Sequence, residues 1–191
     1  MGLFGALEAL YSGLFRAIQS LFGDWFLGLS ARLVFGSVLF TYFINSALTK
    51  VESGFPGIFI PTMNAFAQIA PQAMEAANFD ATQLPFFPHG LMVYAGTYAE
   101  FALPVLILIG LFTRAARLGM IAFIGVMTFV DITQHNVDAE TIGTFFDRIQ
   151  NSAIADQRLL WVFPLLYLVI RGPGFISLDA LLGRMVRENP I

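Results

Sequence analysis

Four long apolar segments, each bounded by ionisable residues, constrain this chain more than any other feature. They run from Leu33 to Thr49, Leu91 to Thr113, Leu118 to Val130 and Leu159 to Ile170. The first two approach the roughly 20 residues that a helix needs to cross a hydrocarbon core of about 30 Å. The last two are shorter, so they can span only if the charges at their outer ends, Asp131 and Arg158, enter the membrane or the bilayer thins there.

Composition supports a lipid environment. The chain has 191 residues, of which 57% are hydrophobic and only 12% are charged, whereas a soluble domain carries about a quarter charged residues. The net charge is -3 and there is no basic run, so a nucleic-acid partner is excluded on electrostatic grounds. There is no Cys, and therefore no thiolate nucleophile and no iron–sulfur ligand.

We therefore predict an all-α polytopic membrane protein, a four-helix bundle forming one domain over residues 1–191. The membrane helices are expected at about 31–49, 91–113, 115–135 and 157–171. Residues 1–28 have Leu, Ile and Trp at spacings of three and four, which indicates an amphipathic helix lying in the interface or packed on a partner subunit. Short helices are expected in both outer loops, one over Met63 to Ile69 and one around Thr141 to Ile149.

Arginine is distributed unevenly between the two ends of the predicted bundle. Seven arginines fall on one side, namely Arg16, Arg32, Arg114, Arg117, Arg171, Arg184 and Arg187. Only Lys50, Arg148 and Arg158 are assigned to the other side. Because cytoplasmic loops retain positive charge, both termini and the tail over 172–191 are predicted to be cytoplasmic. Membrane lipid is therefore an expected partner of the chain.

Polar residues of all four helices fall at one depth when counted from the arginine-rich side. Asn45 is 13 residues after Arg32, and Glu100 is 14 before Arg114. Asp131 is 14 residues after Arg117, and Arg158 is 13 before Arg171. At about 1.5 Å per residue, all four lie roughly 20 Å from the inner arginines. We expect them to face inward, with Arg158 pairing with Glu100 or Asp131.

His135 follows Asp131 by four residues, so the two share a face if the third helix continues that far. A histidine beside a buried carboxylate is suited to proton transfer, as quinol oxidation or quinone reduction requires. We therefore predict a proton or quinone site formed by Glu100, Asp131, His135 and Arg158, with Asn45, Glu100 and His135 near the quinone headgroup. The alternative is that these groups only fix the bundle. Two histidines without a spacing motif do not predict a metal or haem site.

Three stretches resemble the DoxX family of small four-helix bacterial membrane proteins. They are ARLVFGSVLF at the first helix, AEFALPVLILIGLFTRAARLG over the second helix and the turn, and LLYLVIRGPGFISLDALLGR at the end of the last helix. The shared positions are Arg32, Gly36, Lys50, Glu100, Gly110, Arg114, Gly172, Gly174, Ser177 and Asp179.

The resemblance implies a bacterial inner-membrane protein associated with oxidoreductase systems, with relatives that are subunits of thiosulfate:quinone oxidoreductase. It supplies no catalytic residue set. Three functions follow as expectations. The first is a quinone-interacting redox subunit that receives electrons from a partner because it has no evident redox centre. The second is a noncatalytic accessory subunit of a larger membrane or redox complex, and the third is a small-solute or proton-coupled transporter, although no inverted repeat indicates transport.

Overall fold

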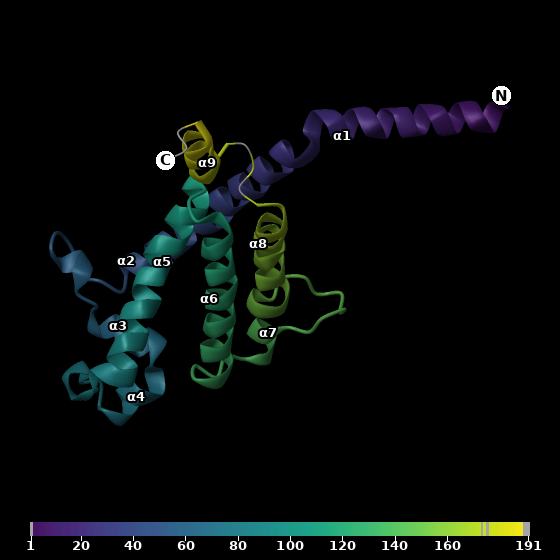
Figure 1. Ribbon diagram of the computed structural model, residues 1–191. Helices are drawn as coiled ribbons and strands as arrows, with labels where there is room; N and C mark the ends of the chain where they lie inside the picture. The colour runs from purple at the N-terminus through teal and green to yellow at the C-terminus, as the bar shows by residue number, and fades with distance from the viewer. Residues whose placement is uncertain (1, 173, 175, 189–191) are drawn as a thin grey trace.

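The computed structural model describes residues 2–172, 174 and 176–188, and it is all-α (Figure 1). It confirms the prediction of four helices long and apolar enough to cross a membrane. These spans are Trp25–Leu48, Phe86–Ile109, Thr113–Thr133 and Ala153–Arg171. Asp131 and Arg158 both lie inside spans, so the two segments that were too short between charges reach membrane length by including their charged ends.

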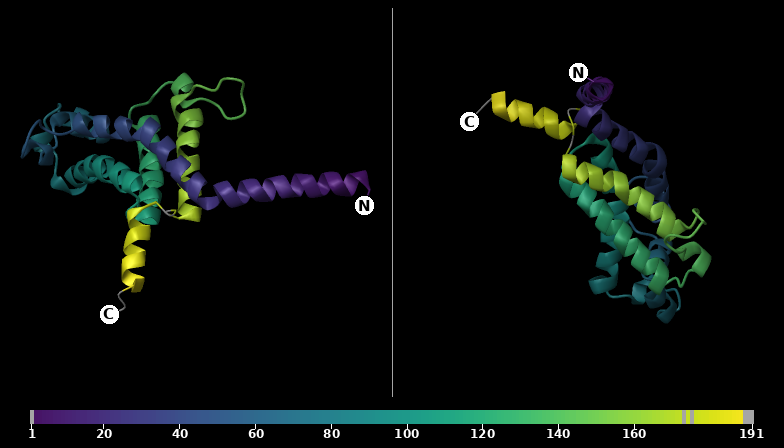
Figure 2. Two further views of the ribbon diagram at one scale, coloured as in Figure 1. Left: turned by 90° about the horizontal axis from the view of Figure 1, so that it is seen from above. Right: turned by 90° about the vertical axis from the view of Figure 1, so that its right-hand side faces the viewer.

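The first span is a continuous helical segment made of three consecutive elements. Helix α1 (Leu3–Phe35) runs into a π-helical turn (Gly36–Phe40) and then into α2 (Thr41–Leu48). The backbone leaves helical geometry at Gly23 (φ -33°, ψ -136°). None of residues 3–22 is buried, and this part of α1 extends away from the other helices (Figures 1 and 2). The expected interfacial segment over 1–28 therefore corresponds to a helix that separates from the bundle at Gly23.

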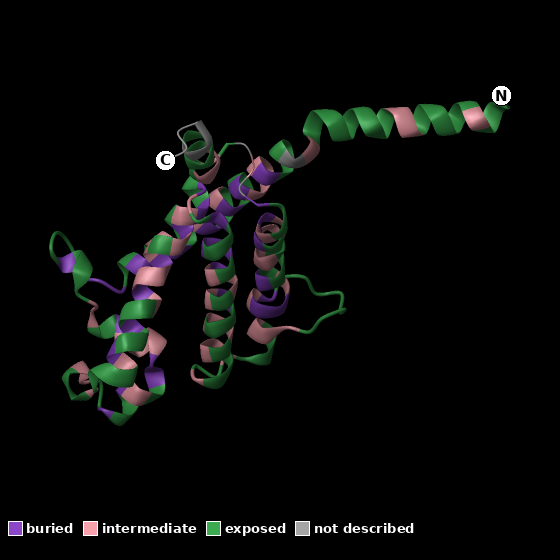
Figure 3. Cartoon of the chain, in the orientation of Figure 1, coloured by how far each residue is buried: buried purple, intermediate pink, exposed green. Residues whose placement is uncertain are grey.

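The four spans pack in a ring. Helix α5 (Leu91–Ile109) contacts α2 and α6 (Thr113–Thr133), and α8 (Leu159–Arg171) contacts α6 and α1. Apolar side chains from all four spans form the core inside the ring, namely Phe35, Leu39, Phe43, Ile107, Ala116, Met120, Ile124 and Leu165. Much of the outer side of these helices is exposed (Figure 3) and carries large apolar residues, which is the pattern of a surface solvated by lipid.

The loop between the first two spans folds into short helices that pack on the bundle. Helix α3 (Met63–Ile69), at the position that the sequence predicted, contacts α5 and is followed by α4 (Pro71–Ala76). Two 3-10 turns (Gly57–Phe59 and Ala81–Gln83) and a π-helical turn (Phe86–Gly90) complete the connection to α5. The loop therefore lies against the end of the bundle opposite the termini (Figure 1).

The loop between the third and fourth spans has less helix than its sequence pattern indicated. Helix α7 covers only Ala139–Ile142, so the helix expected to continue to Ile149 ends early. Gly143 has a φ of +75° and Phe146 a φ of +65°, and a left-handed backbone interrupts an α-helix. The chain re-enters the membrane through the π-helical turn Ala153–Arg158, which leads directly into α8.

The segment that begins α9 (Leu178–Glu188) docks on the tight turn between α5 and α6. Gly110 ends α5 with a φ of +71°, and its carbonyl accepts a hydrogen bond from the Asp179 backbone N–H at 3.0 Å. The Asp179 carboxylate accepts the N–H groups of Phe112 at 2.9 Å and Thr113 at 2.8 Å, where α6 begins. Ser177 precedes α9, and its hydroxyl accepts the Ala180 N–H at 3.1 Å.

Candidate functional site

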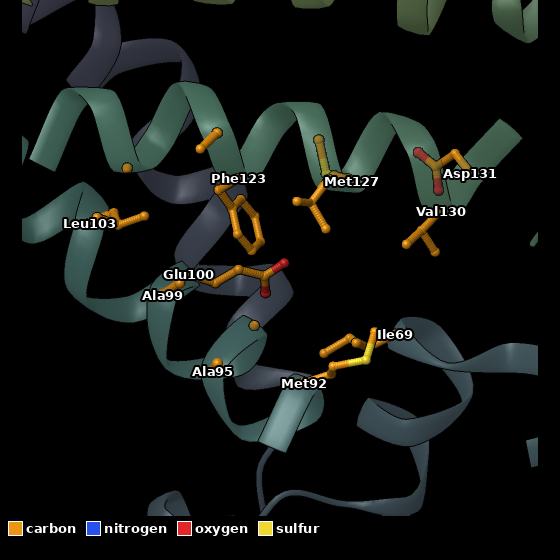
Figure 4. A pocket seen from close by; sticks show the side chains of 14 residues that line it. Ile69, Met92, Ala95, Ala99, Glu100, Leu103, Phe123, Met127, Val130 and Asp131 are labelled. Atoms are coloured by element: carbon orange, nitrogen blue, oxygen red, sulfur yellow. The ribbon is translucent and has the colours of Figure 1, made fainter. Parts of the chain in front are cut away.

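A cavity of about 490 Å³ lies between α5 and α6 in the membrane-spanning part of the bundle (Figure 4). Its size is in the range of small-molecule sites. Small residues on the facing helices, Ala95, Gly96 and Ala99 on α5 and Gly119 and Ala122 on α6, leave the space open. Ile69 of α3 also lines it, so the first loop covers part of the cavity. The remaining lining residues are Met92, Glu100, Leu103, Phe123, Val126, Met127, Val130 and Asp131.

Gly96 is a position where α5 and the covering loop approach each other closely. A Cβ on Gly96 would lie 3.1 Å from Cδ1 of Ile69, which is tighter than an ordinary van der Waals contact. The absence of a side chain at Gly96 therefore lets Ile69 of α3 pack against α5 where both line the cavity.

Glu100 brings a carboxylate to this apolar cavity and is held there by the end of the first span. Lys50 Nζ donates to Glu100 Oε2 at 2.7 Å, and the two side chains are only 4% and 6% exposed. Lys50 Nζ also donates to the Ser46 hydroxyl at 2.8 Å, which in turn lies 3.5 Å from Glu100 Oε1. Oε2 is thus fixed by a cation, whereas Oε1 has one long polar contact among the described residues.

Asp131 brings the second carboxylate from α6. It forms an ion pair with Arg158, whose other terminal nitrogen donates to the Thr128 hydroxyl at 2.7 Å. Arg158 also lines a further cavity of about 530 Å³ between α6, α8 and the second loop. The Arg158–Asp131 pair therefore connects the two sides of α6, with the carboxylate at one cavity and the guanidinium at the other.

The structure brings some of the predicted site residues together at the cavity and leaves the others outside it. Glu100 and Asp131 line one cavity, and Arg158 joins them through Asp131. Arg158 was expected to pair with either carboxylate, and it pairs with Asp131. Asn45 is exposed and is absent from the cavity lining, because the next residue, Ser46, occupies the inward position on α2.

His135 lies outside the cavity because α6 ends at Thr133. The shared face with Asp131 required the helix to continue, and it does not. The His135 side chain is exposed, and its Nε2 is 3.0 Å from the carbonyl oxygen of Gln68, one residue before the cavity-lining Ile69. His135 therefore ties the end of α6 to α3 above the cavity.

Two side chains near the carboxylates were not predicted. Lys50 was assigned to an outer loop, but it is buried and folds back onto Glu100. Ser46 precedes Lys50 by one helical turn, and this spacing was a signal that both could reach the same group.

Among the described residues, no three His, Asp or Glu side chains lie close enough together to hold a metal ion.

The fold and the site define a class: a small membrane protein of four candidate spans, with two carboxylate–cation pairs beside an intramembrane cavity. Within this class the chain belongs to the DoxX family, because the DoxX family model matches residues 27–132, more than half of the sequence. The matched range includes the first two of the three stretches that resemble this family, so it confirms the resemblance there. The match includes Lys50, Glu100 and Asp131 but ends before Arg158. No curated protein and no solved structure matches the chain.

Proposed function

We propose that this DoxX family protein is the membrane subunit of a redox system and that the cavity between α5 and α6 binds a quinone. One observation carries the proposal: two carboxylates of separate helices, Glu100 and Asp131, line one apolar cavity inside the membrane. Ionisable groups at such depth are costly and are retained mainly where they serve a function. We further propose that the membrane is a bacterial inner membrane, with the arginine-rich end and both termini in the cytoplasm.

The lining of the cavity suits a quinone. Its walls are aliphatic and small side chains together with Phe123, which accommodate an apolar ring and its hydrocarbon tail. A bound quinone supplies two-electron, two-proton redox chemistry, and a partner redox subunit supplies or accepts the electrons.

The residues of this chain would handle the protons. Lys50 fixes Oε2 of Glu100, so the less engaged Oε1 is the atom at which Glu100 can take up and release a proton. The charge of Lys50 favours return of Glu100 to the carboxylate form. Asp131 has the same arrangement with Arg158, which engages Oδ2 and leaves Oδ1 for exchange.

The test is quinone retention after purification in native lipid. The wild-type chain should retain quinone above the level of the surrounding membrane, and Glu100→Gln should lose it without loss of the fold. Glu75→Gln is the matched control, because Glu75 is exposed on α4 and the chemical change is identical. Wild-type quinone no higher than the membrane background would refute the proposal.

A second candidate is a noncatalytic accessory subunit, and one observation favours it. Both carboxylates are already paired with cations, which is how charges that only fix a bundle are arranged. This role predicts a stoichiometric partner subunit in the same preparation. It also predicts that Glu100→Gln leaves the chemistry of that partner unchanged.

A further inference from the structure

Two buried arginines at the end of the bundle that carries both termini have guanidinium nitrogens without a hydrogen-bond partner among the described residues. Arg117 is 0% exposed and Arg32 is 6% exposed. Among the described residues, none accepts a hydrogen bond from any of the three guanidinium nitrogens of Arg117 or from Nε of Arg32. Buried guanidinium groups are normally paired, so the unpartnered nitrogens of these two arginines indicate an acceptor beyond the described part of the chain.

The charge around these arginines is unbalanced. Arg117 is influenced by the like charge of Arg32 and by the opposite charge of Asp179. The Asp179 carboxylate, however, accepts the two backbone N–H groups that begin α6. Within the part of the chain that the structure describes, the charge of Asp179 thus faces two buried cations and is already engaged by backbone N–H groups. Because an uncompensated charge is costly away from water, a further anion would stabilise this cluster.

A groove beside Arg32 has room for such an anion and for an apolar tail. It has a volume of about 330 Å³ and lies between α1, the end of α5 and the segment that leads into α9. Its walls include Leu29, Leu33 and Leu108, and Arg32 is the one charged residue among the described residues that line it. Gly110 borders the Arg32 guanidinium, since a Cβ there would lie 3.0 Å from Nη1. The groove is therefore cationic at one point and aliphatic along its length.

The groove also lies at the depth of lipid headgroups. Helix α5 ends at Ile109 and α6 begins at Thr113, so the turn that borders the groove marks the end of two spans. Phosphate groups of a bilayer occupy this level. Arginine binds phosphate oxygens through its planar, multiply donating guanidinium.

We propose that this groove binds an anionic phospholipid, with the phosphate at Arg32, the charge of Arg117 behind it, and an acyl chain along Leu29, Leu33 and Leu108. The site lies at the opposite end of the bundle from the proposed quinone cavity. It therefore stands or fails independently of the proposed function.

The test compares lipids on the purified full-length chain. Phosphatidylglycerol should raise the unfolding temperature and remain bound in native mass spectrometry, whereas phosphatidylcholine and inorganic phosphate should do neither. Arg32→Gln should weaken phosphatidylglycerol binding by about tenfold or more, the loss expected for a charge-assisted hydrogen bond. The matched control is Arg148→Gln, which removes an exposed arginine of the second loop and should leave binding unchanged.

Leu33→Trp provides a test that leaves the arginines in place. Leu33 is 60% exposed and lines the groove, so a larger ring should obstruct the acyl chain and reduce lipid retention. Equal effects of phosphatidylglycerol and phosphatidylcholine would overturn the proposal, as would undiminished binding by Arg32→Gln. Stabilisation by inorganic phosphate to the same extent would assign the site to a free anion and would also overturn it.

Discussion

Lys50 and Arg158 stabilise their carboxylates through additional polar contacts. Lys50 contacts the hydroxyl and carbonyl oxygens of Ser46 as well as Glu100, and Arg158 contacts Thr128 as well as Asp131. Such contacts matter because charge attraction alone seldom offsets the cost of removing two ions from water. Each ion pair is therefore supported by a nearby hydroxyl group, that of Ser46 or of Thr128. Loss of one charged partner leaves the other charge unpaired in an apolar environment.

At this scale we predict that Lys50→Met destabilises the protein by about 3–5 kcal/mol, because it leaves Glu100 buried without its cation. Unfolding of the purified chain in detergent measures the effect. The double variant Lys50→Met/Glu100→Gln should recover part of the loss, since the uncompensated charge is then removed. A double variant that is less stable by the full sum of both single changes would contradict this explanation.

At the scale of elements, the hydrogen bonds of Asp179 join three helices. The residue belongs to α9, its backbone N–H bonds to the end of α5, and its carboxylate accepts the N–H groups that begin α6. A carboxylate at a helix N-terminus satisfies free donors and complements the helix dipole. The short turn between α5 and α6 is thus held by a residue more than 60 positions later in the chain.

We predict that Asp179→Ala costs about 1–2 kcal/mol of stability at neutral pH, the range for a lost helix cap. Burial opposes ionisation of Asp179, but hydrogen bonds from Thr113 and Phe112 and the charge of Arg117 outweigh it and lower its pKa below 3.8. A lowered pKa means that the stabilisation is present above the ordinary value and is lost as the pH falls through the folded-state value.

The difference in unfolding free energy between wild type and Asp179→Ala should therefore shrink as the pH falls below 3.8. Asp138→Ala is the control, because Asp138 accepts the Thr141 N–H at 2.7 Å at the start of the four-residue helix α7 and joins no spans. Its cost should be much smaller. A gap that persists in acid would show that the carboxylate charge of Asp179 is not responsible.

At the scale of the whole molecule, the bundle and the first 22 residues are separate in space. Polar residues Glu8, Ser12, Arg16 and Ser20 recur at every fourth position, so they form one stripe along this helix. Large apolar residues such as Leu7, Leu10 and Leu14 are more than half exposed. A helix with one polar stripe that stands beyond the bundle suits the membrane interface.

We predict that this helix lies at the bilayer surface with Leu10 in the apolar region. Because the chain has no Cys, Leu10→Cys and Ser12→Cys each give a single attachment point for a nitroxide label. In vesicles the label at residue 10 should be more accessible to oxygen, and the label at residue 12 more accessible to a water-soluble relaxation reagent. Equal access at both positions would show that the helix does not lie in the interface.

The sequence by itself determined the environment, the four spans and the all-helical class, because a bilayer forces apolar stretches of sufficient length to satisfy their backbone hydrogen bonds internally. It also indicated that either Asp131 and Arg158 enter the membrane or the bilayer thins there, since their segments were too short without them. Counting along each helix placed Glu100 and Asp131 at one depth, and both line the cavity.

Only the tertiary structure decided which residues meet. Depth along a helix does not give its rotation, so Ser46 rather than Asn45 faces Glu100. A helix end depends on local backbone geometry, so α6 ends before His135. Lys50 reaches Glu100 across 50 residues, and Asp179 caps a helix other than its own. Such long-range pairings arise from the packing of whole helices, and no local sequence pattern specifies them.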